Sequence, residues 1–334
     1  MPDLEVNEKS LELILAKLPL LKKEIQKVIV GQDMILDEIM ISFLAGGHCL
    51  LEGVPGLAKT LMVKTLAQAL DLPFRRIQFT PDLMPSDIIG TEILEEDHST
   101  GKRFFKFNPG PLFTNILLAD EINRTPPKTQ SALLEAMQEF EVTYAGKSYP
   151  LDKPFFILAT QNPIEQSGTY PLPEAQLDRF LLLIRMDYPS ESEEMEILSR
   201  TTGTLKTEIK PVLNGEEIRF CQGLVRQVNI NPDLIQYIRD IIRSTRPDTT
   251  DLTFIKDYVG WGAGPRAGQA MILTAKAHAL LKGRYSVMME DILTVARPVL
   301  RHRILTNFKA EAEGIHSDTI TQRLLESVKR AKVY

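Results

Sequence analysis

Residues 53–60 have the sequence GVPGLAKT and lie between a short apolar run and a segment of helical periodicity. In a glycine-rich turn that leads into a helix, successive backbone N–H groups form a concave site for anions. A lysine at this spacing contacts the outer phosphates of a nucleotide, and the neighbouring hydroxyl binds Mg²⁺. We therefore predict a site for ATP or ADP with its Mg²⁺. The candidate binding residues of this turn are Gly53, Val54, Pro55, Gly56, Leu57, Ala58, Lys59, Thr60 and Leu61, with Thr60 on the metal.

The turn departs at one position from the phosphate-binding pattern G-x-x-x-x-G-K-T. Ala58 stands where that pattern has its second glycine. A methyl group is tolerated where φ is negative, and we expect a negative φ at this entry into the helix. For the turn taken alone, the alternative interpretation is an ordinary strand-to-helix connection with a surface lysine.

Two carboxylates follow the apolar run 115–119 in the segment NILLADEINR. Acidic side chains at the end of a central strand are costly unless they face a metal or a polar cleft. Asp120 is placed to hold Mg²⁺ through water beside Thr60, and Glu121 to orient and deprotonate an attacking water. The alternative is a pair of acids that caps the loop.

Four further side chains are candidates for the same chemistry. Asn162 follows the apolar run 155–159, and neighbouring strand ends of a parallel sheet open onto one crevice, where an amide can hold the attacking water. A turn-forming asparagine before a proline is the alternative. Arg124, Arg179 and Arg266 could stabilise phosphoryl-transfer charge in cis or from a neighbouring subunit, although each taken alone fits a surface ion pair.

The elements that must position these residues follow from the apolar pattern. Five apolar runs without polar alternation, separated by helical stretches, predict an α/β fold with a parallel sheet covered on both faces. These runs are 48–51, 74–79, 115–119, 155–159 and 181–186. We predict a helical lead-in plus α/β domain over 1–189 and a smaller all-helical domain over 190–334. Pro19 and Pro298 are expected to interrupt the helices that contain them.

Composition narrows the class of protein. The chain has 334 residues, 43% of them apolar and 25% charged, with a net charge of −5, which argues weakly against a dedicated nucleic-acid binder. Cys49 and Cys221 fit buried apolar positions, and the five histidines form no zinc-binding pattern. The acidic N-terminus lacks the pattern of a signal peptide, and no run is long enough to span a membrane. We expect a cytoplasmic protein.

In their order along the chain, these motifs resemble those of the AAA+ ATPases, most closely the MoxR family. GVPGLAKT resembles the Walker A loop, including its alanine, and LLADEINR resembles Walker B. Asn162 in ATQNP is similar in position to sensor 1, Arg179 in LDRF to the arginine finger, and Arg266 in GPRA to sensor 2. The segment VIVGQ resembles the box that lines the adenine pocket, and its candidate residues are Val30, Gly31 and Gln32.

Two patterned hairpins extend the resemblance to the helix-2-insert branch of AAA+, which includes magnesium-chelatase subunits. One interrupts 80–113 and turns near 97–101, and the other spans 141–155 with its turn at Ala145 and Gly146. In ring-forming relatives such hairpins project toward the pore. The resemblance implies an AAA+ P-loop domain with a helical lid and a ring of identical subunits, usually a hexamer, in which Arg179 reaches the neighbouring nucleotide. It also implies a partner with a von Willebrand A domain and a protein client.

Three functions are compatible with these motifs. The first is an ATP-hydrolysing, chaperone-like remodelling or assembly factor, favoured because the lysine, both acids and the arginine are present. The second is a nucleotide-regulated binding switch with little turnover. Ala58, the departure from the phosphate-binding pattern, is the one feature that favours it. The third is a DNA-remodelling motor, whose best support is the basic segment LRHRI at 300–304; a solvated helix end or an acid-pairing patch is the alternative there.

Overall fold

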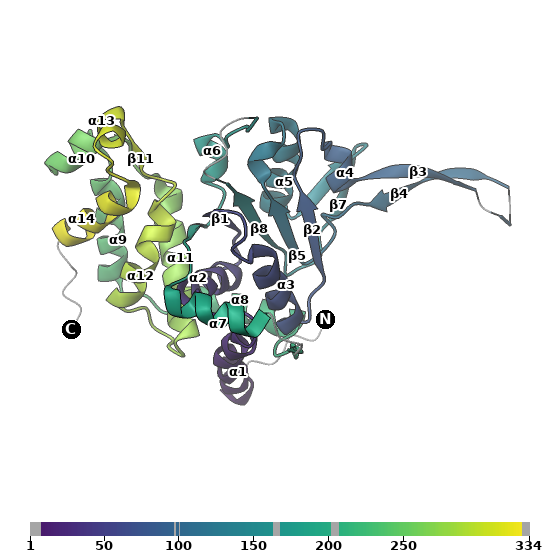
Figure 1. Ribbon diagram of the computed structural model, residues 1–334, viewed down its shortest axis with the longest axis horizontal. Coiled ribbons are helices and arrows are strands. Elements are labelled where there is room, and N and C mark those ends of the chain that lie inside the picture. The colour runs from purple at the N-terminus through teal and green to yellow at the C-terminus, as the bar shows by residue number, and fades with distance from the viewer. Residues whose placement is uncertain (1–7, 97, 100, 163–167, 202–206, 329–334) are drawn as a thin grey trace.

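The sheet at the centre of the molecule has five parallel strands in the order β2-β5-β8-β1-β9. Figure 1 shows this computed structural model, which describes residues 8–96, 98–99, 101–162, 168–201 and 207–328. The strands are β1 (Cys49–Gly53), β2 (Phe74–Gln78), β5 (Ile116–Asp120), β8 (Phe156–Gln161) and β9 (Leu182–Met186). All five apolar runs therefore form strands, and the predicted parallel sheet is confirmed.

Both faces of this sheet are buried, as unalternating strands require. On one face the side chains pack against α1 (Glu8–Gln26), α2 (Asp33–Leu44) and α3 (Lys59–Ala69). On the other face they pack against α4 (Pro85–Ile89) and α5 (Pro127–Glu139). Within β1 the two sides alternate, since Leu51 belongs to the first cluster and Leu50 to the second.

Two antiparallel hairpins leave this core. The longer one, β3 (Gly90–Glu96) with β4 (Arg103–Pro109), projects far from the body in Figure 1. The shorter one pairs β6 (Glu141–Tyr144) with β7 (Lys147–Pro150). Both predicted hairpins are confirmed, although residues 97 and 100 of the first turn lie outside the described residues. Phe107 of β4 stacks on Tyr149 of β7 with ring centroids 4.1 Å apart, so the two hairpins contact each other at their bases.

The second half of the chain is mostly helical, as predicted. Its helices are α7 (Glu191–Thr201), α8 (Gly215–Gln227), α9 (Pro232–Ser244), α10 (Thr253–Tyr258), α11 (Pro265–Leu281), α12 (Met289–Leu300), α13 (Phe308–Ala312) and α14 (Ser317–Ser327). The sequence did not indicate the short antiparallel pair β10 (Val259–Trp261) and β11 (Leu305–Thr306). Buried apolar residues of α8 to α12 and of α14 belong to the same cluster as one face of the sheet. The proposed division at residue 189 stays a prediction.

The prediction that two prolines interrupt their helices was wrong. Pro19 lies inside α1 and Pro298 inside α12. A proline removes one backbone hydrogen bond from a helix, but packing outweighs that loss here. In α1 the buried residues Leu18 and Leu21 hold the helix on the core while Pro19 faces solvent, where the freed carbonyl can bond to water.

The basic segment at 300–304 is not available to nucleic acid. Arg303 and His302 are 7% and 6% exposed. Arg303 donates from Nη2 to the carbonyl of Phe180, which precedes β9, and Nε2 of His302 lies 3.1 Å from the same oxygen. Arg303 also pairs with Asp178 through Nε at 2.7 Å, and Arg301 pairs with Asp318 at 2.9 Å. The acid-pairing interpretation is correct, but the segment is buried rather than solvated. The DNA hypothesis loses its main support.

None of the helices in the described ranges combines the length and apolar character needed to cross a bilayer. The two cysteines are buried and unbridged, as predicted. Burial raises the pKa of the Cys221 thiol to about 12, so it has no thiolate chemistry near neutral pH.

Candidate nucleotide site

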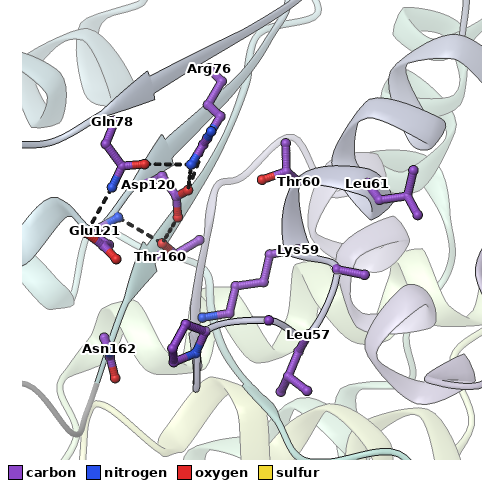
Figure 2. Close-up of a pocket in the computed structure, with 13 residues that line it drawn as sticks. Leu57, Lys59, Thr60, Leu61, Arg76, Gln78, Asp120, Glu121, Thr160 and Asn162 are labelled. Carbon is purple, nitrogen blue, oxygen red and sulfur yellow. Dashed lines mark hydrogen bonds and ion pairs between the residues drawn. The ribbon is translucent and has the colours of Figure 1, made fainter. Parts of the chain in front are cut away.

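A cavity of about 480 Å³ opens where the 53–60 turn meets the ends of β2, β5 and β8. Figure 2 shows Lys59 and Thr60 on one side of it and the carboxylates of Asp120 and Glu121 on the other. The residues that line the cavity are Pro55, Gly56, Leu57, Ala58, Lys59, Thr60, Leu61, Arg76, Gln78, Asp120, Glu121, Thr160 and Asn162. The structure thus brings together the predicted phosphate loop, both predicted acids and the predicted amide.

The backbone of the turn corrects one expectation. Gly56 has φ of +89°, which glycine adopts without strain. Ala58 has φ of +57° and ψ of 24°, so the expected negative φ was wrong. Ala58 is the residue before α3, and the left-handed conformation turns the chain from the loop into the helix. A left-handed residue with a Cβ costs roughly 1–2 kcal/mol, and such strain concentrates at functional sites.

Lys59 is held across the mouth of the turn. Its Nζ donates a hydrogen bond to the carbonyl oxygen of Gly53, which fixes the ammonium group beside the N-terminus of α3. Burial is the larger influence and lowers the pKa of Lys59 from its usual value. Nearby carboxylates act in the opposite direction, and they belong to Asp120, Glu121 and Glu52. The Lys59 ammonium group and the N-terminus of α3 both carry positive charge on this side of the cavity. They therefore suit an anionic ligand.

The two acids are fixed by a threonine from the neighbouring strand. Oγ1 of Thr160 donates to Oδ1 of Asp120 at 2.6 Å. Oγ1 of Thr160 also accepts from the backbone N–H of Glu121 at 2.9 Å. Glu121 has φ of +57°, which points its side chain back toward the cavity instead of along the strand direction. Its carboxylate also pairs with Arg124 of the short helix Ile122–Arg124, at 3.1 Å.

Two residues of β2 complete the polar wall, and the sequence analysis missed both. Arg76 donates to Oδ2 of Asp120 from Nη2 at 2.6 Å and from Nε at 3.1 Å. Gln78 accepts from Arg76 at 2.6 Å and donates to Oε2 of Glu121 at 2.9 Å. Their spacing of two residues at the end of a strand was the available signal, because alternate residues of a strand point to the same side.

The residues present fit a nucleotide-bound magnesium ion. Mg²⁺ prefers six oxygen ligands and usually keeps several waters, with one or two protein oxygens beside the phosphates. Asp120 and the hydroxyl of Thr60 face the same cavity and supply that kind of donor. Among the described residues no group of three or more histidine, cysteine or acidic side chains could hold a metal alone. The described part of the chain thus offers donors that match a metal arriving with phosphate rather than one held by protein side chains alone.

Several predicted residues do not line this cavity. Arg179 lies between α6 (Glu174–Leu177) and β9, and Arg266 lies in the first turn of α11, where it is 3.8 Å from Asp178. Arg179 directly follows this aspartate in the sequence, and neither arginine is among the residues that line the cavity. Arg124 is bound to the acid of its own chain, as described above.

The predicted adenine-box residues also lie outside the cavity lining. Gly31 and Gln32 both have positive φ, of 66° and 56°. The φ of Gly31 favours glycine, and a Cβ there would lie 2.1 Å from Oε1 of Glu193, so the end of that side chain would have to move. Glu193 also helps to begin α7 through hydrogen bonds from Ser190 at 2.7 and 2.8 Å. The 30–32 segment thus lies against Glu193 in the chain that follows β9. Its contact with adenine stays a prediction.

Comparison with known proteins agrees with this geometry. The family model described as "ATPase family associated with various cellular activities (AAA)" matches residues 48–182, and an AAA lid domain model matches 252–324. Chaperone MoxR1 of Mycobacterium tuberculosis is 43% identical over 91% of this chain and 80% of its own length. The chain belongs to the MoxR family of AAA+ ATPases.

Other MoxR relatives cover as much of the chain. Protein YeaC of Bacillus subtilis, which is uncharacterized, is 44% identical over 93% of this chain and 95% of its own length. A crystal structure from Cytophaga hutchinsonii superposes with a TM-score of 0.89 at 42% identity and covers 96% of this chain and 97% of that one. The MoxR assignment therefore applies to the AAA+ core and the lid together, and the predicted fold is confirmed.

Proposed function

We propose that this MoxR protein hydrolyses ATP to ADP and phosphate in the cavity at the 53–60 turn, with Mg²⁺ bound beside the phosphates. The observation that carries the proposal is the placement of Lys59 opposite Asp120 and Glu121 across a single cavity. A phosphate cradle without these acids would bind nucleotide but would lack a base. The pair of acids without the cradle would have no anionic substrate to act on.

Each side chain has a distinct task in this proposal. The backbone of the turn and Lys59 bind the phosphate oxygens, and Thr60 and Asp120 hold the metal. Mg²⁺ bound there would neutralise charge that develops on the transferring phosphoryl group. Glu121 accepts a proton from the attacking water, and Asn162 positions that water. Arg124 and Gln78 orient the Glu121 carboxylate until the substrate enters.

The proposal requires a second subunit. An arginine stabilises the charge that develops on the transferring phosphoryl group. Arg76 and Arg124 are already paired with Asp120 and Glu121, and neither Arg179 nor Arg266 lines the cavity of its own chain. We infer that identical subunits form a ring, a hexamer by analogy with AAA+ proteins, in which Arg179 enters the neighbouring cavity. The site of one chain alone is then incomplete, and ATPase activity per subunit should rise with protein concentration.

The decisive test is Glu121→Gln, which keeps the size of the side chain and removes the base. We expect ATP binding to persist and phosphate release to fall by at least about a hundredfold, the size of a general-base contribution. Glu139→Gln, at the exposed end of α5, is the matched control and should behave as wild type. An unchanged rate of phosphate release in Glu121→Gln would remove Glu121 from the mechanism. No release by the wild type at high protein concentration would favour a binding switch.

For the biological role we propose chaperone-like remodelling or assembly of a protein client, together with a partner that carries a von Willebrand A domain. The support is that the relative MoxR1 is named a chaperone. A cytoplasmic location and the hairpins at a ring pore belong to the same proposal. ATP-trapped Glu121→Gln protein should retain partner and client in a pull-down, and loss of capture when ATP is omitted would show that retention depends on the nucleotide state.

A further inference from the structure

Arg76 forms an ion pair that the proposed hydrolysis does not require. Its guanidinium places two N–H groups on Oδ2 of Asp120, from Nη2 and from Nε. A carboxylate oxygen has two lone-pair sites, so Arg76 takes both positions on this atom. Thr160 binds Oδ1 of the same carboxylate. Little of Asp120 is therefore left to accept from a metal-bound water while Arg76 stays in place.

We propose that Arg76 is a positioning residue that competes with Mg²⁺ for Asp120, so that it sets how strongly the metal is coupled to nucleotide binding. This inference rests on the proposed function, because it takes Asp120 as the carboxylate that faces the metal. In the free protein Arg76 neutralises and orients Asp120. When the metal enters with its nucleotide, Arg76 yields Oδ2.

The exposure of the two side chains favours Arg76 as the partner that moves. Arg76 lies on β2, the edge strand of the sheet, and its side chain is 46% exposed. Asp120 lies on β5 between two strands, is only 15% exposed and is fixed through Thr160. A long exposed side chain changes rotamer at small cost, whereas the buried carboxylate cannot turn without losing its threonine. Arg76 therefore swings away and Asp120 stays.

Release of Arg76 also affects the second acid. Nη2 of Arg76 donates to Oε1 of Gln78, and this bond directs the amide so that Nε2 donates to Glu121. Figure 2 shows the resulting chain from Asp120 through Arg76 and Gln78 to Glu121. When Arg76 leaves, Gln78 loses the contact that fixes its amide. Binding of the metal at Asp120 is thereby linked to loss of the Gln78 contact on Glu121, the group proposed to act as base, while Arg124 keeps its ion pair with that carboxylate.

The test measures nucleotide affinity rather than turnover. The dissociation constant of a fluorescent, non-hydrolysable ATP analogue is measured with excess Mg²⁺ and with EDTA, for wild type, Arg76→Gln, Arg76→Lys and Arg75→Gln. Arg75 is the matched control, because it is the exposed neighbour on the same strand and points to the opposite side. The melting temperature of each variant without nucleotide reports whether it folds.

We expect Arg76→Gln to tighten nucleotide binding about fivefold in Mg²⁺, because the free energy of a partly exposed ion pair reaches at most about that factor in an equilibrium constant. Nucleotide binding in EDTA should stay unchanged. Arg76→Lys keeps the charge but loses the two-pronged contact, so it should lie between Arg76→Gln and wild type. Arg75→Gln should match wild type. If Arg76→Gln does not fold, Arg76→Lys still carries the test.

Two results would overturn the inference. Equal affinity in Mg²⁺ for wild type and the Arg76 variants would make the ion pair merely structural. Weaker binding in EDTA would show that Arg76 contacts the phosphates directly. Failure of the proposed function has a different signature, because wild-type protein itself would then show no Mg²⁺-dependent nucleotide binding.

Discussion

Replacing Ala58 by glycine tests the geometry of the phosphate turn by the sign of a stability change. Ala58 has φ of +57°, in the left-handed region that residues with a Cβ avoid. Our expectation from sequence alone was a negative φ. The two conformations predict opposite effects of the same substitution, so the experiment decides between them.

The magnitude follows from two opposing contributions. A left-handed alanine costs roughly 1–2 kcal/mol, which glycine does not incur. Glycine in turn gives the unfolded chain more freedom, which costs about 0.4–1 kcal/mol. We therefore expect Ala58→Gly to raise the free energy of unfolding by about 0.5–1 kcal/mol, or the melting temperature by about 2 °C. At a negative φ the substitution would instead lower it by roughly 0.5–1 kcal/mol.

Denaturant unfolding of three alanine-to-glycine variants provides the assay. Ala145 is exposed, with φ of +49° in the short hairpin turn, and Ala145→Gly should also stabilise the protein. Ala132 lies inside helix α5, and Ala132→Gly should destabilise it by about 1 kcal/mol. Destabilisation of Ala58→Gly alongside a stabilised Ala145→Gly would refute the left-handed geometry of the phosphate turn.

Two further predictions concern buried groups. His48 accepts from the N–H of Ile157 and binds the carbonyl of Met137, and burial lowers its pKa to about 4. In the unfolded chain this pKa is about 6.5. The stability that neutral His48 contributes above pH 6.5 should therefore fall by about 3 kcal/mol as the pH drops toward 4. Unfolding at several pH values should show this slope in wild type and a shallower one in His48→Gln, and equal slopes would contradict it. Arg303→Met should lower stability by about 1–3 kcal/mol, because it removes the buried donors from the carbonyls of Leu181 and Val299. A loss under about 0.5 kcal/mol in thermal unfolding would contradict it.

The strands and the phosphate turn could be predicted because their signals are local. Each apolar run contains its own evidence for a buried strand, and the glycines, Lys59 and Thr60 lie within eight consecutive residues. Asp120 and Asn162 could be added because parallel strands must end at one edge of the sheet. The parallel topology thus brings residues from separate sequence motifs together in one site.

What could not be predicted depends on contacts between distant segments. Arg76 and Asp120 are 44 residues apart, and their pairing follows from the register of β2 on β5. Pro19 was expected to end its helix because local propensity says so, and tertiary packing overrode it. The conformation of Ala58 was misjudged because a residue's neighbours in sequence do not show which way a turn must direct its N–H groups.

Contacts of Arg303 connect the lid to the chain around Arg179. Arg303, after α12, uses Nε on Asp178 and its two terminal nitrogens on carbonyls of Phe180 and Leu181. Asp178 also faces Arg266 of α11 and directly precedes Arg179. Arg303 therefore connects the lid to the residues on both sides of Arg179, and Asp178 connects the same segment to Arg266. In the ring that we propose, displacement of the lid would move Arg179 through these contacts.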